Sequence, residues 1–427
     1  MKQRHIVALG LAAALTTLTA CGGGGDEPAD TAGAGGAAGE EQTLTIWYMD
    51  GSAPEEWLTG ITEEFEAAHP GVTVDAQVQQ WNGIQERITT ALSEDNPPDI
   101  VELGNTQALG YAATGGLTDL TDIKADLGGD EWNAAMAEST EYDGGTYSAP
   151  WYAAARVVIY DKTVYEAAGV EAPTTRDEWL DGLAAIQESN PDVQPIYLPG
   201  QSWYVYAGFL WDEGGDFAND AGEGTLNTPE AAAAMEFYKE LHSYSTAPTD
   251  IDEATPQQST EVIPNGGVAS WIGLGWEYAG AIAADPALEE RFGFFPIPGK
   301  TADQPGHVFL GGSNLAIPLR SQNADLAEEW LKLAMSDKWQ GEYAAATGAL
   351  PNRESLNSAL EGNAFAEAMS QAASAGDITP MLEGWAAVET SPNPVKEYMT
   401  KVLNGEDPQA AGEEASAEIT ERIASAG

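Results

Sequence analysis

Residues 43–48 of the chain are Thr-Leu-Thr-Ile-Trp-Tyr, residues 72–78 are Val-Thr-Val-Asp-Ala-Gln-Val, and residues 99–103 are Asp-Ile-Val-Glu-Leu. β-Branched and apolar residues dominate all three stretches, which predicts three strands. Apolar residues at helical spacing fill residues 54–69 and 83–94 between them. Strands that alternate with helices in this way predict an α/β fold with a parallel sheet and crossover helices.

The loops after the first and third strands are the places where we expect a ligand. Ligands of open α/β sheets bind outside the carboxyl ends of the strands. Met49–Ala53 leaves the first strand at that edge, and Gly104–Gln107 leaves the third strand and leads into a short helix expected over 107–114. These two loops are therefore candidate ligand loops.

The rest of the chain combines aromatic clusters with further helices and strands. An apolar run, Val157–Tyr160, follows the aromatic pair Trp151-Tyr152, and five aromatic residues lie within Ser202–Trp211. Phe309–Pro318 predicts a glycine-rich strand, and Leu326–Thr347 predicts one long amphipathic helix. There is no tandem repeat.

The N-terminus has the layout of a secretory signal. Lys2 and Arg4 precede an apolar run without charge, and residues 18–21 are Leu-Thr-Ala-Cys. This ending resembles the bacterial lipobox, in which lipid is attached to the cysteine and residues 1–20 are removed. The alternative is an ordinary signal peptide with an incidental cysteine. Cys21, the chain's one cysteine, has no disulfide partner, and residues 22–42 are rich in Gly, Ala and acidic residues, which predicts a flexible linker.

Length and charge narrow the classes of function. About 385 residues follow the linker, more than one hydrophobic core usually holds, so two lobes are expected. The formal net charge is -51, with acidic residues spread along the whole chain. Nucleic acid is excluded as a partner because phosphate contacts need clustered Lys and Arg. A solvated acidic surface and a cation store are both consistent with the charge, and the first is favoured because no acidic block stands out.

Several stretches together resemble family 1 extracellular solute-binding proteins, which belong to the periplasmic-binding-protein superfamily and serve sugar ABC importers. The resemblance covers nearly all of residues 43–420 and depends on the order and spacing of the stretches, since each alone is weak. The stretches are the strand ending at Trp47, Pro98–Leu103, Tyr147–Lys162, Trp211–Gly215, Gly275–Glu277, Gly311–Pro318 and Gly348–Arg353.

The resemblance implies two α/β lobes, each a mixed sheet flanked by helices, that close on a ligand about a hinge of crossing strands. By this resemblance the first lobe is 43–150 with 314–356, and the second is 155–310 with 357–427. The crossings are expected near 150–155, near 311–314 and after Leu356. The implied protein is a monomer without cofactor or metal, held by lipid at the outer face of the cell membrane, that passes a carbohydrate to ABC permease subunits.

A sugar site needs flat aromatic faces and side chains that both donate and accept hydrogen bonds. The resemblance carries this requirement onto fourteen residues: Asp50, Ser52, Asn105, Gln107, Trp151, Tyr152, Arg156, Trp203, Tyr204, Trp276, Glu277, Ser313, Asn314 and Trp385.

Alternatives stay open for several of these side chains. Trp203, Trp276 and Trp385 are interpreted as stacking residues or as core, Asn314 as a ligand contact or a backbone cap, and Glu277 as a ligand contact or an ion-pair partner. Many members of the family carry an acidic residue directly after the position of Trp151-Tyr152, where this chain has three alanines. One hydrogen bond to the sugar is therefore missing or comes from elsewhere.

Two other classes of function are an enzyme and a binding protein for a ligand other than sugar. A secreted glycoside hydrolase needs two carboxylates at a defined separation, and no pair stands out among 68 acidic residues. No metalloprotease or serine-hydrolase motif is present either, so we expect no enzyme. The third hypothesis is the same fold with a polyamine, metal ion or peptide as its ligand.

Overall fold

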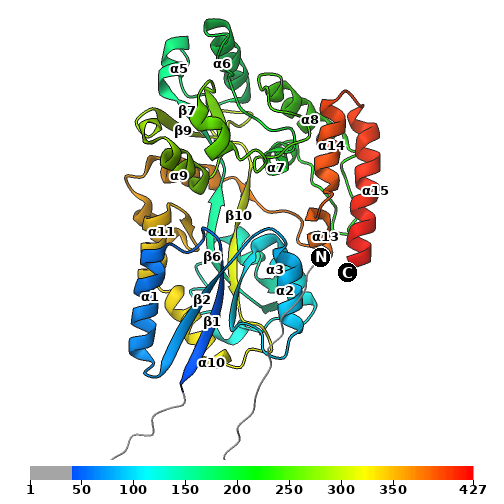
Figure 1. Ribbon diagram of the computed structural model, residues 1–427. Helices are drawn as coiled ribbons and strands as arrows, with labels where there is room; N and C mark the ends of the chain where they lie inside the picture. The colour runs from blue at the N-terminus through cyan, green and yellow to red at the C-terminus, as the bar shows by residue number, and fades with distance from the viewer. Residues whose placement is uncertain (1–40, 427) are drawn as a thin grey trace, which may run out of the picture. The chain divides into compact units, whose positions relative to one another are not determined.

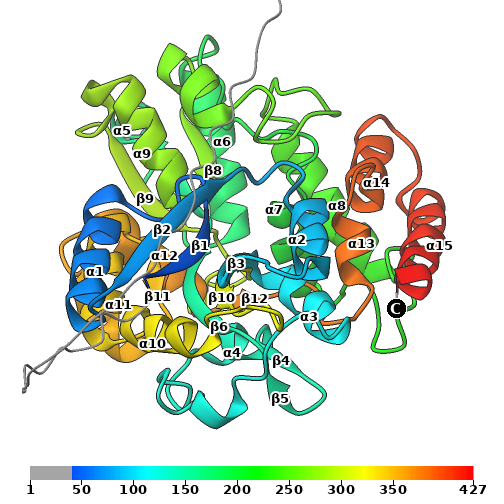
Figure 2. The ribbon, with the colours of Figure 1, turned by 60° about the horizontal axis from the view of Figure 1, so that its bottom comes forward.

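The computed structural model describes residues 41–426. The predicted signal segment, Cys21 and nearly all of the predicted linker lie outside the described residues. Figures 1 and 2 show the arrangement of the elements from two directions. We call lobe 1 the part built on the larger sheet and lobe 2 the part built on a three-stranded sheet.

Lobe 1 is built on a seven-stranded mixed sheet with the order β11-β6-β10-β3-β1-β2, in which β12 pairs with β10. β1 runs parallel to β2 and β3, whereas β10 runs antiparallel to β3 and β6. The strands are β1 (Gln42–Met49), β2 (Val72–Gln79), β3 (Ile100–Gly104), β6 (Ala149–Ala155), β10 (Val308–Ala316), β11 (Leu350–Pro351) and β12 (Gly376–Asp377).

Helices cover both faces of this sheet (Figure 2). Trp57 and Phe65 of α1 pack in one core with residues of α10 and α11, and Ile88 of α2 and Ala112 of α3 pack in a second. Alternate residues of β1 belong to these two cores, as expected for a strand buried on both faces. The helices and small strands of lobe 1 are α1 (Glu55–Ala68), α2 (Ile84–Ser93), α3 (Asn105–Ala113), η1 (Thr121–Ile123), α4 (Ala134–Glu138), β4 (Glu141–Tyr142), β5 (Gly145–Thr146), α10 (Ala324–Ala334) and α11 (Asp337–Thr347).

Lobe 2 is built on the antiparallel sheet β8-β7-β9 and carries a third, larger core. Its strands are β7 (Val157–Asp161), β8 (Ser270–Gly273) and β9 (Phe292–Pro296). Its helices are α5 (Lys162–Ala168), α6 (Arg176–Ser189), α7 (Trp203–Asp212), α8 (Pro229–His242), the π-helix η2 (Gln258–Val262), η3 (Ile263–Asn265), α9 (Gly275–Ala284), η4 (Pro286–Leu288), η5 (Glu354–Leu360), α12 (Ala364–Ala373), α13 (Trp385–Glu389), α14 (Pro394–Leu403) and α15 (Pro408–Ala426).

Two long strands, β6 and β10, join the lobes (Figure 1). A single residue, Arg156, separates the end of β6 from the start of β7 in the other sheet. β6 and β10 lie so close that a Cβ on Gly312 would be 2.2 Å from the carbonyl oxygen of Tyr152. Only glycine fits at this point of the crossing, because any side chain would push the two strands apart.

The sequence predicted the first six elements within two residues at each end, but its prediction of one long helix over 326–347 is wrong. The structure has two helices there, α10 and α11, with a break at Met335-Ser336. The Ser336 side chain accepts a hydrogen bond from the Trp339 backbone N–H and so caps a new helix. The apolar periodicity continues across the break, which is why the pattern alone did not reveal it.

No helix of residues 41–426 is long and apolar enough to cross a membrane. The lobe boundaries expected from the sequence stay a prediction, although β6 and β10 do span the expected crossings near 150–155 and 311–314.

Candidate functional site

The first group of polar side chains surrounds Glu102, a fully buried residue of β3. Its carboxylate accepts hydrogen bonds from the Met49 backbone N–H at 2.7 Å, from Ser52 Oγ at 2.5 Å and from the Tyr152 hydroxyl at 3.4 Å. Ser313 Oγ donates in turn to the Tyr152 hydroxyl at 3.2 Å. Burial raises the pKa of Glu102, and the hydrogen bonds oppose that rise. Three predicted residues are thus brought together around a carboxylate that the sequence analysis did not select.

A second group lies where β6 passes into lobe 2. The Arg156 guanidinium contacts Glu253 Oε1 at 2.7 Å and lies 5.1 Å from the centre of the Tyr204 ring. Ser202 Oγ donates to Glu253 Oε2 at 3.2 Å. Tyr204 stacks on Phe309 of β10 with ring centres 4.2 Å apart. Arg156 and Tyr204, both predicted site residues, are therefore in direct contact, and Glu253 fixes the arginine.

Glu277 is 1% exposed, and both oxygens of its carboxylate accept hydrogen bonds from groups of the protein itself. One oxygen accepts from Gln258 Nε2 at 2.7 Å, and the other accepts from the Leu274 backbone N–H at 2.9 Å, at the start of α9. Burial raises the pKa of Glu277 to about 7, against the attraction of Arg156. The π-helix η2 supplies Gln258, and such irregular turns are frequent at functional sites.

A third group joins the two lobes through Glu389. Its carboxylate accepts from Trp385 Nε1 at 2.9 Å within α13 and from Thr106 Oγ1 of lobe 1 at 2.9 Å. Burial raises the pKa of Glu389, and hydrogen bonds from Trp385, Thr106 and Gln107 oppose the rise. The predicted residues Gln107 and Trp385 are therefore neighbours of one shared acidic residue.

The remaining predicted residues differ in their exposure. Asp50 and Trp276 are exposed, Trp276 by 57%. Asn105 is buried and its Nδ2 donates to the Leu310 carbonyl at 3.0 Å. Asn314 is buried and donates to Ser139 and Ser148, which braces the loop beside β10.

Three predicted tryptophans have their rings inside the protein. Trp151 packs against Trp57 and Tyr343 in the core of lobe 1. Trp203 and Trp385 belong to the core of lobe 2, where both lie against Phe217. Their role as ligand contacts stays a prediction, as does the role of every site residue named from the sequence.

The sequence analysis missed three acidic residues, Glu102, Glu253 and Glu389. For Glu102 a signal existed: it is an acid inside an otherwise apolar strand, and a buried charge needs partners. For Glu253 and Glu389 the sequence offered no such signal, because only the fold brings them to Arg156 and Thr106.

Carboxylates and aromatic rings thus lie together at the junction of two α/β lobes. The family model for bacterial extracellular solute-binding proteins matches residues 29–341. The chain is a bacterial extracellular solute-binding protein. The diacetylchitobiose-binding protein DasA of Streptomyces coelicolor is 49% identical to it over an alignment of 428 positions that covers 99% of each chain.

Solved structures share the fold of this solute-binding protein. The GacH receptor of Streptomyces glaucescens, solved unliganded and with acarbose, has a TM-score of 0.78 at 23% identity, over 90% of this chain and 99% of that one. The sugar-binding protein MalE of Xanthomonas citri has a TM-score of 0.79 at 24% identity, over 90% and 98% of the two chains. At these identities the likeness supports the two-lobed α/β fold alone.

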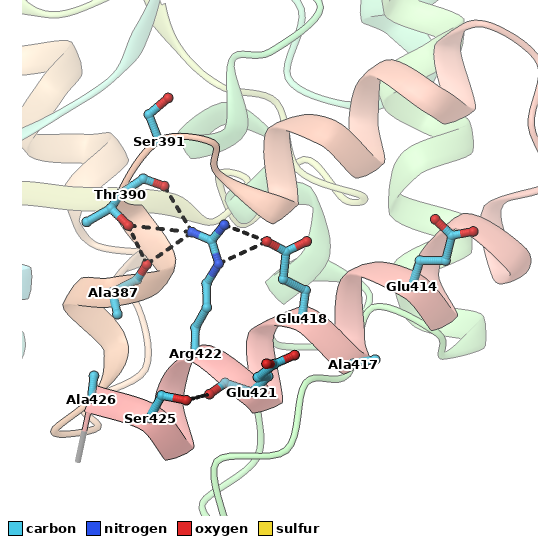
Figure 3. A pocket seen from close by; sticks show the side chains of 10 residues that line it. All are labelled: Ala387, Thr390, Ser391, Glu414, Ala417, Glu418, Glu421, Arg422, Ser425 and Ala426. Atoms are coloured by element: carbon cyan, nitrogen blue, oxygen red, sulfur yellow. Dashed lines mark hydrogen bonds and ion pairs between the residues drawn. The ribbon is translucent and has the colours of Figure 1, made fainter.

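A hollow of about 850 Å³ lies elsewhere on the solute-binding protein, between α13 and α15 (Figure 3). Arg422 is the cation there, and its guanidinium already donates to Glu418 and to the carbonyl oxygens of Ala387 and Thr390. The hollow is wide and has no aromatic face. We therefore place the candidate site at the lobe junction and not here.

Within residues 41–426, no three His, Cys, Asp or Glu side chains are grouped so as to hold a metal ion.

Proposed function

We propose that this protein binds a short N-acetylated amino-sugar oligosaccharide, of the diacetylchitobiose type, outside the cytoplasm. The observation that carries the proposal is the 49% identity to a diacetylchitobiose-binding protein over 99% of both chains. The junction of the lobes suits such a ligand, because aromatic rings stack on pyranose faces and carboxylates accept hydrogen bonds from hydroxyl and amide groups.

We further propose that the bound sugar is delivered to the permease subunits of an ABC importer and is not chemically changed. The protein would act as a monomer, attached to the outer face of the membrane by lipid on Cys21 and kept near its permease by the linker up to residue 42. Tethering raises the effective concentration of the protein at the permease. Membership of a family of binding proteins supports this role.

The lobe division expected from the sequence is also kept as a proposal: 43–150 with 314–356, and 155–310 with 357–427. In its support, every residue of the two lobe 1 cores falls in the first set of segments apart from Trp151, which lies at the crossing. The core of lobe 2 falls in the second set apart from a few residues, among them Met136 and Leu350.

Isothermal titration calorimetry of the chain from residue 22 onward tests the ligand. We expect binding of diacetylchitobiose, and weaker binding of maltose and spermidine. Binding of spermidine but of no sugar would overturn the proposal in favour of a cationic ligand. Turnover of a chromogenic chitobioside would overturn the proposal that the sugar is not chemically changed.

A further inference from the structure

Trp81 is a large apolar side chain for which the fold provides no cover. It is 43% exposed. In the part of the chain that the structure describes, the other large apolar side chains as exposed as this are Val78, Trp276 and Leu319. Single exposed apolar residues are ordinary on protein surfaces, so the position of Trp81 must decide what it does.

Trp81 lies at the carboxyl edge of the lobe 1 sheet. Met49, the last residue of β1, is opposite Gln79, the last residue of β2, and the Asp50 backbone N–H donates to the Gln79 carbonyl at 2.8 Å. Two residues further on, Trp81 is therefore level with the loop that carries Asp50 and Ser52. This is the edge at which α/β sheets bind ligands.

The backbone at Trp81 is held in place. The Ile84 backbone N–H donates to the Trp81 carbonyl at 3.2 Å, and Gly83 turns the chain into α2 with φ 74°. A left-handed residue at this position favours glycine. The backbone that carries the indole is thus held in a turn, so ligand binding need not order this part of the chain.

The same edge of lobe 1 meets lobe 2. Asn105 and Thr106, which follow β3 at this edge, donate to Leu310 and to Glu389. On the other side, the last residue of β8, Gly273, pairs with Val157, the first residue after the crossing. Trp276 follows three residues later. Two exposed tryptophans therefore stand at the junction, one on each lobe.

Trp81 is also far from the polar groups at the crossing strands. The order β10-β3-β1-β2 puts β2 three strand spacings, about 14 Å, from β10. That distance exceeds the size of one pyranose ring. A monosaccharide beside the paired residues Ser313 and Tyr152 does not reach the end of β2, whereas a chain of rings along the edge does.

We propose that Trp81 is an outer stacking platform on lobe 1, which contacts a ring of an oligosaccharide other than the ring nearest the crossing strands. The proposal rests on the proposed function and deepens it. It makes Trp81 a determinant of ligand length, so that the protein prefers oligosaccharides to the single sugar.

The test compares wild type with Trp81→Ala, Trp81→Phe and Leu319→Ala by calorimetry with N-acetylglucosamine, diacetylchitobiose and triacetylchitotriose. Leu319 is the matched control, because it is 60% exposed and follows β10 at the opposite edge of the sheet. We expect Trp81→Ala to weaken binding of the longest ligand about tenfold, from lost apolar burial. Trp81→Phe should restore most of the affinity, and Leu319→Ala should change nothing.

Three results would overturn the proposal, and they are distinguishable. Wild-type affinity of Trp81→Ala for every ligand that wild type binds would exclude a contact. An equal loss for the single sugar and the oligosaccharides would place Trp81 at the central ring. If wild type binds none of the three ligands, the proposed function fails and the outer platform fails with it.

Discussion

Replacing Glu277 by glutamine tests whether this buried carboxyl is neutral when the protein is folded. Its pKa rises from 4.5 to about 7 because burial removes water from the charged form, and Glu253 adds repulsion that Arg156 opposes. The folded protein then holds a proton that the unfolded chain releases. Stability must therefore fall as the pH rises from about 4.5 to about 7, by about 3 kcal/mol in all.

Glutamine does not titrate, so the unfolding free energy of the Glu277→Gln protein does not fall in this way as the pH rises. The substitution carries its own cost, because Gln258 Nε2 donates to Glu277 and to the Ile272 carbonyl and is not free to turn. That cost is the same at every pH. The informative quantity is the difference in unfolding free energy between variant and wild type, which should rise by about 2–3 kcal/mol from pH 5 to pH 8.

Urea unfolding followed by circular dichroism at a series of pH values measures this difference. Glu178→Gln is the matched control, because Glu178 also accepts from the backbone at the start of a helix but is solvent-exposed, and its hydrogen bonds lower its pKa. The contribution of Glu178 is lost only when the pH falls below the ordinary glutamate range, so its difference should be flat between pH 5 and pH 8. A flat profile for Glu277→Gln would refute the reasoning.

The other predictions separate core from site and test the contact between the lobes. Trp385→Ala should lower the unfolding free energy by about 3–5 kcal/mol, since the ring is 1% exposed; a loss below about 1 kcal/mol in urea would contradict its place in the core. Trp276→Ala should leave stability within about 0.5 kcal/mol and weaken diacetylchitobiose binding by about 1–3 kcal/mol, and unchanged affinity in calorimetry would remove it from the site. Thr106→Val removes the hydroxyl that donates to Glu389 in the other lobe, so small-angle scattering should give a larger radius of gyration. An unchanged radius would mean that this hydrogen bond does not hold the lobes together.

Local patterns were sufficient to predict much of lobe 1. β1, α1, β2, α2 and β3 follow in order with short connections, so period and composition located each of them. The break between α10 and α11 was missed because Ser336 interrupts the backbone without interrupting the apolar stripe. Propensity was weak evidence there, and a capping side chain decided the structure.

The candidate site was harder to predict because its contacts join residues far apart in the chain. Tyr152 and Ser313 were selected as neighbours of the crossings, but the carboxylate to which Tyr152 donates is 50 residues before it. Trp81 was passed over because the second strand was not counted among the ligand loops. The sequence was sufficient to identify loops at the ends of strands as candidates. It was not sufficient to identify the carboxylates that the fold buries between them.

Arg156 stands alone between β6 and β7, and this has a mechanical consequence. When two bodies turn about a pivot, displacement grows with distance from the pivot. The ion pair of Arg156 with Glu253 lies next to the pivot and is stretched little by an opening motion. The Thr106–Glu389 bond joins α3 of one lobe to α13 of the other, so any motion that separates the lobes must break it. Opening would thus separate Thr106 from Glu389 while the ion pair at the crossing keeps its geometry.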